Sequence, residues 1–160
     1  MIKVGVVGYG TVGKRVADAV MCQDDMTLIG ITANSFNYKI IAAHQKKIPI
    51  YALGEKQPLL DAGIKIAGNF DDLLKSCQVI VDCTPGKIGQ KNKEIYNKYP
   101  VKVLYQGGEK EHVGEVSFAA QANYNNARGK KHVRVVSCNT TGLSRMLYCL
   151  DQGFGVESCR

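Results

Sequence analysis

A cysteine followed by an amide and two hydroxyls is the first candidate for chemistry. In "VRVVSCNTTGLSR" (Val133–Arg145), Cys138 ends a β-branched strand pattern and precedes apolar residues at helical spacing. The dipole and free N–H groups of a helix N-terminus stabilise a thiolate, which makes the sulfur nucleophilic. Asn139, Thr140 and Thr141 supply groups that could cap the helix or bind an oxyanion or a substrate phosphate. We predict a covalent-catalysis site here.

A glycine-rich turn lies between the first predicted strand and the first predicted helix. It reads Gly8-Tyr9-Gly10-Thr11-Val12-Gly13, with the spacing G-x-G-x-x-G. Gly8 permits the tight turn, Gly10 lets backbone N–H groups approach a pyrophosphate, and Gly13 lets the helix pack on the strand. The helix N-terminus adds partial positive charge. In this context the turn predicts a dinucleotide site.

The end of the second strand bears on the choice between NAD and NADP. An NAD-selective site has an acidic residue about 20 residues beyond the glycine loop, but residues 31–39, "ITANSFNYK", contain none. A 2′-phosphate therefore meets no repulsion, and NADP is favoured or tolerated. Asn34 and Ser35 are the expected donors, with Lys39 as a counter-charge; the alternative is that these residues only bond their own backbone.

Two further turns are expected at the same edge of the sheet. Thr84, Pro85 and Gly86 follow the strand "VIVDC", and "QGGEK" (Gln106–Lys110) follows the next strand. In open α/β sheets, ligands bind outside the carboxyl ends of the strands. We therefore expect the turn at Thr84–Gly86 beside the cofactor and the glycine pair near its nicotinamide end. The alternative is that both are merely flexible turns.

Short Val/Ile-rich runs alternate with helical segments, which predicts a doubly wound α/β domain with a parallel sheet covered on both faces. We predict no helix or strand for the polar stretch after residue 52 or for the residues around 111–132. The expected strands are residues 3–8, 27–32, 48–52, 64–68, 78–84, 101–106 and 133–138, and the expected helices are 11–22, 37–47, 69–77, 87–99 and the segment after Cys138.

The position of Cys138 on the ligand-binding edge favours catalysis over the alternative of a buried structural cysteine. A cysteine nucleophile beside NAD(P) implies aldehyde oxidation through a thioester. Such chemistry needs a general base, but His132 precedes Cys138 by six residues on one strand, roughly 20 Å away. We expect His44 and His112 to be surface residues, so the chain lacks a convincing base.

The overall composition predicts an ordinary globular protein of the cytoplasm. The 160 residues are 45% apolar and 22% charged, without a long apolar run or a secretory signal. None of the six cysteines forms a C-x-x-C pair, so we predict neither zinc nor a disulfide framework. The net charge of +7 is spread along the chain, with only "GKKHVR" (residues 129–134) clustered, and it does not favour nucleic-acid binding.

At these residues the chain resembles archaeal-type glyceraldehyde-3-phosphate dehydrogenase over nearly all of its length. The resemblance is carried by "GVVGYGTVGKRVADAV", "DCTPGKIGQKNK", "YQGGEKEHVGEVSFAAQANYN" and "RVVSCNTTGLSR", of which the last two are the most specific. It implies that Cys138 is the nucleophile, that Ser137 and Asn139 help to hold the substrate, that Thr11 and Val12 contact the cofactor, and that Gly108 lies near the nicotinamide.

The resemblance also implies a reaction and an assembly. Members of the family oxidise glyceraldehyde 3-phosphate with inorganic phosphate to 1,3-bisphosphoglycerate, use NADP or NAD, and form cytoplasmic homotetramers. Ala33 stands where many relatives carry a lysine for the 2′-phosphate, which weakens the expectation of NADP. The family enzyme is about twice as long, and its second domain supplies the catalytic histidine.

We therefore expect residues 1–139 to form the dinucleotide-binding domain, with residues 140–160 as a helix and the start of a truncated catalytic domain. Such a chain, a fragment or a truncated gene product, would bind cofactor without turning over alone. Two alternatives remain open. One is a non-enzymatic dinucleotide-binding or regulatory module, and the other is an aspartate-semialdehyde-type dehydrogenase, which shares the fold and the cysteine chemistry.

Overall fold

The computed structural model describes residues 1–159, which form eight strands, seven α-helices and one 3-10 helix. The strands are β1 (Ile2–Val7), β2 (Met26–Ala33), β3 (Ile50–Ala52), β4 (Ile66–Asn69), β5 (Val79–Asp82), β6 (Lys102–Tyr105), β7 (Val116–Phe118) and β8 (His132–Val135). The helices are α1 (Thr11–Met21), α2 (Tyr38–Gln45), α3 (Gln57–Asp61), α4 (Phe70–Ser76), α5 (Ile88–Tyr96), η1 (Glu111–Val113), α6 (Ala120–Ala127) and α7 (Cys138–Phe154).

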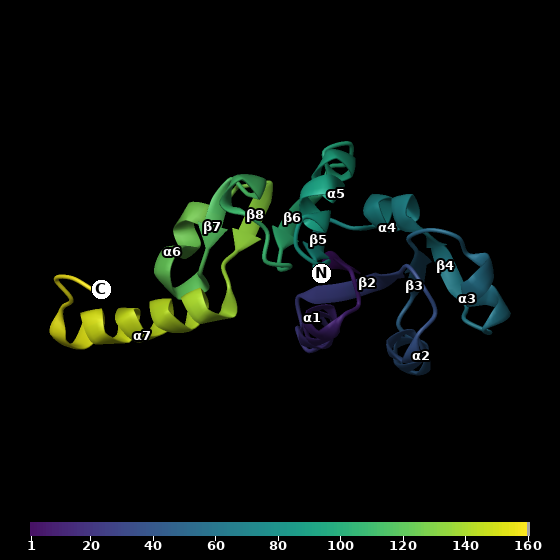
Figure 1. Cartoon of the computed structure of the whole chain (residues 1–160), viewed down its shortest axis with the longest axis horizontal. Helices are drawn as coiled ribbons and strands as arrows, with labels where there is room; N and C mark the ends of the chain where they lie inside the picture. The colour runs from purple at the N-terminus through teal and green to yellow at the C-terminus, as the bar shows by residue number, and fades with distance from the viewer. Residues whose placement is uncertain (160) are drawn as a thin grey trace.

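All eight strands belong to one parallel sheet, in the order β4-β3-β2-β1-β5-β6-β8-β7. The chain begins near the centre with β1, builds outward to β4, and then returns to place β5 on the other side of β1 (Figure 1). The carboxyl ends of β1 and β5 flank this reversal of strand order, which is where open α/β sheets bind ligands. The predicted doubly wound α/β fold is confirmed, and it is of the Rossmann NAD(P)-binding type.

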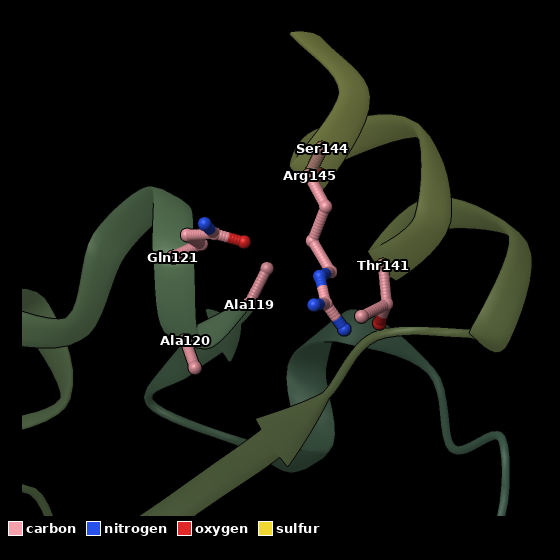
Figure 2. A pocket seen from close by; sticks show the side chains of 6 residues that line it. All are labelled: Ala119, Ala120, Gln121, Thr141, Ser144 and Arg145. Atoms are coloured by element: carbon pink, nitrogen blue, oxygen red, sulfur yellow. The ribbon is translucent and has the colours of Figure 1, made fainter. Parts of the chain in front are cut away.

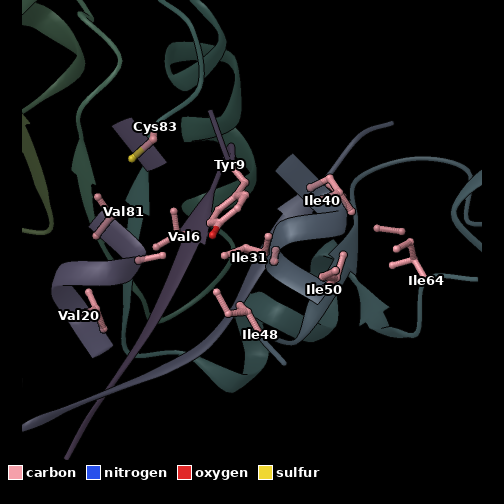
Figure 3. Packing of buried hydrophobic residues seen from close by; sticks show 14 of the residues in the cluster. Val6, Tyr9, Val20, Ile31, Ile40, Ile48, Ile50, Ile64, Val81 and Cys83 are labelled. Atoms are coloured by element: carbon pink, nitrogen blue, oxygen red, sulfur yellow. The ribbon is translucent and has the colours of Figure 1, made fainter. Parts of the chain in front are cut away.

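The helices bury a layer of apolar side chains on each face of the sheet. On one face, Ile31 of β2 packs with Val20 of α1 and Ile40 of α2 (Figure 3). On the other face, Leu73 of α4 and Tyr96 of α5 are fully buried. Figure 1 shows α1 and α2 on the opposite side of the sheet from α4 and α5. Strands with both faces covered explain the nearly continuous Val/Ile runs of the sequence.

Side-chain caps set the start of several helices. Asn69 and Asp72 form a capping box at α4, in which each side chain accepts a hydrogen bond from the other residue's backbone N–H, at 2.9 and 2.8 Å. At α7 the hydroxyl of Ser137 accepts from the backbone N–H of Thr140 at 3.2 Å. The cap predicted at Asn69 is therefore confirmed.

The predicted boundaries around Cys138 need a correction. We expected the last strand to run to Cys138 and the cap residues to follow it, but β8 ends at Val135 and α7 begins at Cys138 itself. The reason is that Ser137, on the N-terminal side of the cysteine, caps the helix. The strand expected from Ile64 likewise begins two residues later, at Ile66.

The last part of the chain is much less buried than the rest. Neither α6 nor α7 has a buried residue, and Figure 1 shows α7 extending away from the sheet. Four short elements of the chain were not predicted: α3, η1, β7 and α6. Within residues 1–159, no helix has both the length and the apolarity needed to cross a bilayer.

Candidate active site

The glycine loop after β1 has the geometry that its three glycines predict. Gly8 has φ +86°, and its N–H donates to the hydroxyl of Thr32 on β2 at 2.9 Å. A Cβ on Gly13 would lie 1.9 Å from the carbonyl oxygen of Gly8, so only glycine lets α1 approach the strand this closely. Gly10 precedes α1, and a Cβ there would meet nothing within 4 Å. The loop therefore presents open backbone at a helix N-terminus.

A cleft of about 580 Å³ lies over this loop and the ends of β2 and β5; we call it the glycine-loop pocket. It is lined by six of the eleven predicted cofactor-binding residues and by Lys39. The six are Gly8, Gly10, Asn34, Ser35, Thr84 and Pro85. No Asp or Glu among residues 1–159 lines it, so a 2′-phosphate would meet no carboxylate. The Lys39 Nζ lies 5.8 Å from the ring centroid of Tyr38.

The remaining five predicted cofactor residues do not line this pocket. Gly13 is buried beneath the loop, and Thr11 is the first residue of α1. Gly86 lies against the glycine pair, because a Cβ there would be 3.5 Å from the carbonyl oxygen of Gly107. Val12 and Gly108 line a different cleft, which also contains Cys138.

A buried carboxylate that sequence reasoning missed holds the Thr84 turn. Asp82 is 1% exposed, and one of its oxygens accepts hydrogen bonds from the N–H and the hydroxyl of Thr84. The other oxygen accepts from the Asn92 amide at 3.0 Å and the Tyr96 hydroxyl at 2.6 Å, both on α5. Four donors satisfy this buried charge, and they fasten the turn to the helix behind it.

The two loops at the ends of β5 and β6 pack backbone against backbone. A Cβ on Gly107 would lie 1.8 Å from the carbonyl oxygen of Thr84, and Gly108 has φ +77°. The next residue, Glu109, is 3% exposed and accepts from the Gly89 N–H at the start of α5. The Arg134 Nε donates to the Glu109 carbonyl oxygen at 2.6 Å. Gly107 is thus required for the close packing and Gly108 for the left-handed backbone, and the loop is held from two sides.

Cys138 lies in a second cleft of about 680 Å³, which we call the cysteine pocket. Its thiol is exposed and stands 3.8 Å from the Asn139 Oδ1. Val12, Gly108 and Ser137 line the same pocket, together with Thr141 and Arg145. Of the three predicted substrate residues, Ser137 therefore faces the cleft. Asn139 and Thr140 do not line it, and the hydroxyls of Thr140 and Ser137 lie 2.9 Å apart.

All six cysteines are free, and they differ in exposure. Cys77 and Cys83 are buried, and burial raises the pKa of each thiol to about 12. Both are consequently protonated and inert near neutral pH. Cys138 is exposed at the start of α7. Three other cysteines are exposed elsewhere on the surface: Cys22, Cys149 and Cys159.

Among residues 1–159, no histidine lines the cysteine pocket. His132 begins β8, at the far end of the strand, where its Nδ1 lies 2.9 Å from the Tyr105 hydroxyl and its Nε2 lies 2.9 Å from the Asn97 Oδ1. Burial lowers its pKa, with the nearby Lys93 and Lys131 charges acting in the same direction. His44 is exposed on α2 and His112 is exposed in η1. The described residues therefore bring no histidine to the thiol.

Comparison with known proteins gives a family and a set of relatives. The family described as "Dihydrodipicolinate reductase, N-terminus" matches residues 2–122. Glyceraldehyde-3-phosphate dehydrogenase of Thermococcus kodakarensis is 54% identical over 153 residues, covering 94% of this chain and 46% of the relative. The enzyme of Methanococcoides burtonii is 47% identical over 160 residues, covering 99% and 48%. The chain thus spans about half the length of the curated relatives it matches.

Among solved structures, aspartate semialdehyde dehydrogenase with NADP from Candida albicans matches with a TM-score of 0.64 at 17% identity. The match covers 98% of this chain and 48% of that chain, and at this identity it supports the fold alone. The chain belongs to the family represented by the N-terminus of dihydrodipicolinate reductase, and it is homologous to archaeal glyceraldehyde-3-phosphate dehydrogenases.

Proposed function

We propose that this chain is the dinucleotide-binding and nucleophile-bearing part of a phosphorylating glyceraldehyde-3-phosphate dehydrogenase. The observation that carries the proposal is the cysteine pocket, which places Cys138 in one cleft with Val12 of the glycine-loop helix and with Gly108. A dinucleotide bound along the glycine loop would reach this thiol. The relatives named for this activity support the assignment.

The residues fit the dinucleotide. Gly10 leaves open space at the N-terminus of α1, and the glycine-loop pocket offers polar groups from Asn34, Ser35 and Thr84. The lining holds no carboxylate among residues 1–159, and Lys39 is the cation at its rim, so NADP is favoured over NAD. We expect Lys39→Gln to weaken NADP binding more than NAD binding in parallel calorimetric titrations.

The reaction follows from the thiol and its position. Cys138 as thiolate attacks the aldehyde carbon, forming a C–S bond and a thiohemiacetal. NADP or NAD, when bound, supplies the acceptor for the hydride that leaves this carbon. Inorganic phosphate then attacks the resulting thioester, the C–S bond breaks, and 1,3-bisphosphoglycerate leaves with the thiolate restored. The thiohemiacetal proton needs a base, and since no histidine lines the pocket, the 160-residue chain is expected not to turn over alone.

The first test measures the thiol and the cofactor together. Mass-resolved alkylation should modify Cys138 several-fold faster than the exposed Cys22 and Cys149, which serve as internal controls. Saturating NADP should change the rate at Cys138 alone. If Cys138 reacts like the two controls and ignores NADP, the proposal is wrong and a non-enzymatic dinucleotide-binding module is favoured.

The second test separates cofactor binding from folding. In Gly10→Ala the added methyl meets no atom of the chain within 4 Å, so the folded state should keep its stability. The methyl would, however, stand where a pyrophosphate approaches the helix N-terminus, and we expect NADP affinity to fall roughly tenfold. Unchanged affinity in this variant would contradict a pyrophosphate site at the loop.

Three broader assignments belong to this proposal. We propose that the protein acts in the cytoplasm and that the intact enzyme is a homo-oligomer, a tetramer in the family it resembles. We also keep the division into a dinucleotide-binding domain of residues 1–139 and the start of a catalytic domain at residues 140–160, whose last residue lies outside the described ones.

The apolar side chains exposed on α7, such as Leu143 and Phe154, support a further contact surface there. Light scattering of the purified chain and of the full-length enzyme measures the oligomeric state.

A further inference from the structure

A cleft at the amino edge of the sheet is separate from the site described above. The cleft between α6 and α7 in Figure 2 shares Thr141 and Arg145 with the cysteine pocket, so it belongs to that site. The separate cleft has a volume of about 390 Å³ and lies where the chain enters β3 and β4, at the end of the sheet remote from α7 (Figure 1). We call it the amino-edge pocket; it is lined by His44, Lys47, Ile48, Pro49, Lys65 and Ala67.

Three basic side chains line the amino-edge pocket from three segments of the chain. His44 is in the last turn of α2, Lys47 is in the turn that follows, and Lys65 immediately precedes β4. Among residues 1–159, no Asp or Glu lines the pocket and neither lysine has a carboxylate within 4 Å. The neighbouring Lys46 differs, because its Nζ lies 2.6 Å from the Asp18 Oδ1. The pocket therefore has two positive charges that the described part of the chain does not neutralise.

The backbone at Lys47 shows that one of these charges comes at a cost in stability. The Lys47 N–H donates to the His44 carbonyl oxygen at 2.9 Å, and the Ile48 N–H donates to the Ala43 carbonyl oxygen at 3.1 Å. This pair of hydrogen bonds is the Schellman motif, which ends a helix with one residue in the left-handed conformation. Lys47 has φ +59°, where glycine is favoured because a Cβ resists this conformation. A lysine thus stands where glycine would be more stable.

The rest of the lining is apolar. Ile48 is 5% exposed and belongs to the core beside Ile50 (Figure 3), whereas Pro49 and Ala67 are exposed. A bare inorganic ion would contact only the basic part of the pocket, but a ligand with an apolar or planar body would cover the apolar part as well. The volume is smaller than the 580 Å³ of the glycine-loop pocket, so it suits a ligand smaller than a dinucleotide.

We infer that the amino-edge pocket binds a phosphate monoester with a planar or apolar body, of the size of a nucleoside monophosphate. A phosphate monoester carries close to two negative charges and three terminal oxygens, which match the two ammonium groups and the imidazole N–H. A carboxylate would bring only one charge against the two lysines. The site lies at the opposite edge of the sheet from the glycine loop, and the inference does not depend on the proposed function.

The experiment uses pyridoxal 5′-phosphate, which has a phosphate and an aldehyde on a planar ring, with the full 160-residue chain. The aldehyde condenses with a lysine amine to an imine, releasing water, and borohydride reduces the imine to a stable amine that mass spectrometry locates. Pyridoxal, which lacks the phosphate, measures the intrinsic reactivity of each lysine. Because the label is located by residue, binding in the glycine-loop pocket would be seen separately, at Lys39.

We expect the phosphate to raise labelling of Lys47 and Lys65 several-fold over labelling by pyridoxal, with no such gain at the exposed Lys75 of α4. AMP should suppress this gain at lower concentration than inorganic phosphate. In Lys47→Gly the concentration of probe that half-labels Lys65 should rise about tenfold. Glycine suits the turn, so the urea midpoint of this variant should not fall, and lost labelling cannot be attributed to misfolding.

Two further variants make the test specific. Lys65→Gln should remove the phosphate-dependent gain at Lys47, because both lysines hold the same ligand, and Lys75→Gln is the matched control that should change neither. The inference is wrong if pyridoxal labels the two pocket lysines as well as its phosphate does, or if each lysine keeps its gain when the other is replaced. Suppression by inorganic phosphate as effective as that by AMP would overturn the assignment to an organic phosphate.

Discussion

Around the glycine loop, α1 packs so closely that a Cβ on Gly13 would lie 1.9 Å from a backbone oxygen, whereas a Cβ on Gly142 of α7 would meet nothing within 4 Å. The first region contributes side chains to a buried core, and α7 has no buried residue at all. The chain therefore supplies the contacts that shape its dinucleotide site. In the cysteine region, the chain fixes the start of α7 and leaves most of the surface of this helix exposed.

This difference indicates that cofactor binding depends on contacts within this chain more fully than catalysis at Cys138 does. The buried hydrogen bonds of Asp82 to Thr84, Asn92 and Tyr96 hold one cofactor-side turn from within the domain. Around Cys138 the hydrogen bonds are fewer and more exposed: the Ser137 hydroxyl caps α7, and the Asn139 Oδ1 lies 3.8 Å from the thiol. We therefore expect cofactor affinity to be a property of this chain, and catalytic competence to require further contacts on α7.

The same substitution in the two regions should have opposite effects. Gly13→Ala forces a methyl into the Gly8 carbonyl, where the backbone cannot yield, and should destabilise the fold by more than about 3 kcal/mol. Gly142→Ala adds a methyl in open space inside a helix and should stabilise it by about 0.5–1 kcal/mol. Urea unfolding of both variants checks this. Equal effects would show that the packing contrast between α1 and α7 is not real.

A leucine in the buried core of the sheet and a leucine on α7 extend the comparison to side chains. Leu73 of α4 is fully buried, and Leu73→Ala should cost at least about 2 kcal/mol. Leu150 of α7 is 47% exposed, and Leu150→Ala should change the stability by less than about 0.5 kcal/mol. The measurement is the midpoint of urea unfolding, with the dependence of the unfolding free energy on urea concentration unchanged between the variants. A large cost at Leu150 would mean that α7 is covered in solution, by association or otherwise.

Much of the central fold could be predicted because its signals are local. Short Val/Ile runs, the G-x-G-x-x-G spacing and the Asn69 cap each lie within a few residues, and each has the predicted structure. The elements that were missed have weak local signals. β7 has only three residues, and α6 is interrupted at Asn123, whose φ of −148° is non-helical. The insertion of β8 between β6 and β7 is a long-range choice that no local pattern encodes.

The candidate site divides in the same way. The sequence predicted that the turns after β1, β2 and β5 would meet, and one pocket contains residues from all three. It missed the buried carboxylates of Asp82 and Glu109, because most of their hydrogen-bond partners lie 10 to 20 residues away along the chain. An acidic residue ending an apolar strand, as in "VIVDC", is the signal that could have pointed to Asp82. The binding roles of the individual residues stay predictions.

A hydroxyl in the well-packed region offers a smaller test. Tyr9, within the glycine loop, points its ring into the core beside Ile31 (Figure 3). Its hydroxyl oxygen is buried without a hydrogen-bond partner among residues 1–159, and burial raises its pKa. Removing an unsatisfied buried polar group relieves its desolvation cost. Tyr9→Phe should therefore raise the stability by up to about 1 kcal/mol, and a loss of stability would show that the hydroxyl has a partner.

The smallest effect concerns pH and the junction between the two regions. His132 links β8 to β6 and to the end of α5, and its Nε2 must carry the proton because the Asn97 Oδ1 can only accept. Its Nδ1 then accepts from the Tyr105 hydroxyl, so the ring is held neutral. Burial, aided by Lys93 and Lys131, lowers the pKa of this histidine below its ordinary value.

Because the folded state resists protonation of His132, the unfolded chain binds the extra proton first as the pH falls through about 6.5. The free energy of unfolding should therefore decrease from pH 7 toward pH 5.5 and stop decreasing on this account once the folded ring also protonates. His132→Gln removes this part of the slope, while His44→Gln on the exposed side of α2 is the matched control. Urea unfolding at both pH values measures it. An identical slope in the wild type and His132→Gln would mean that the ring between Tyr105 and Asn97 is accessible enough to charge in place, and that this junction is as open as α7.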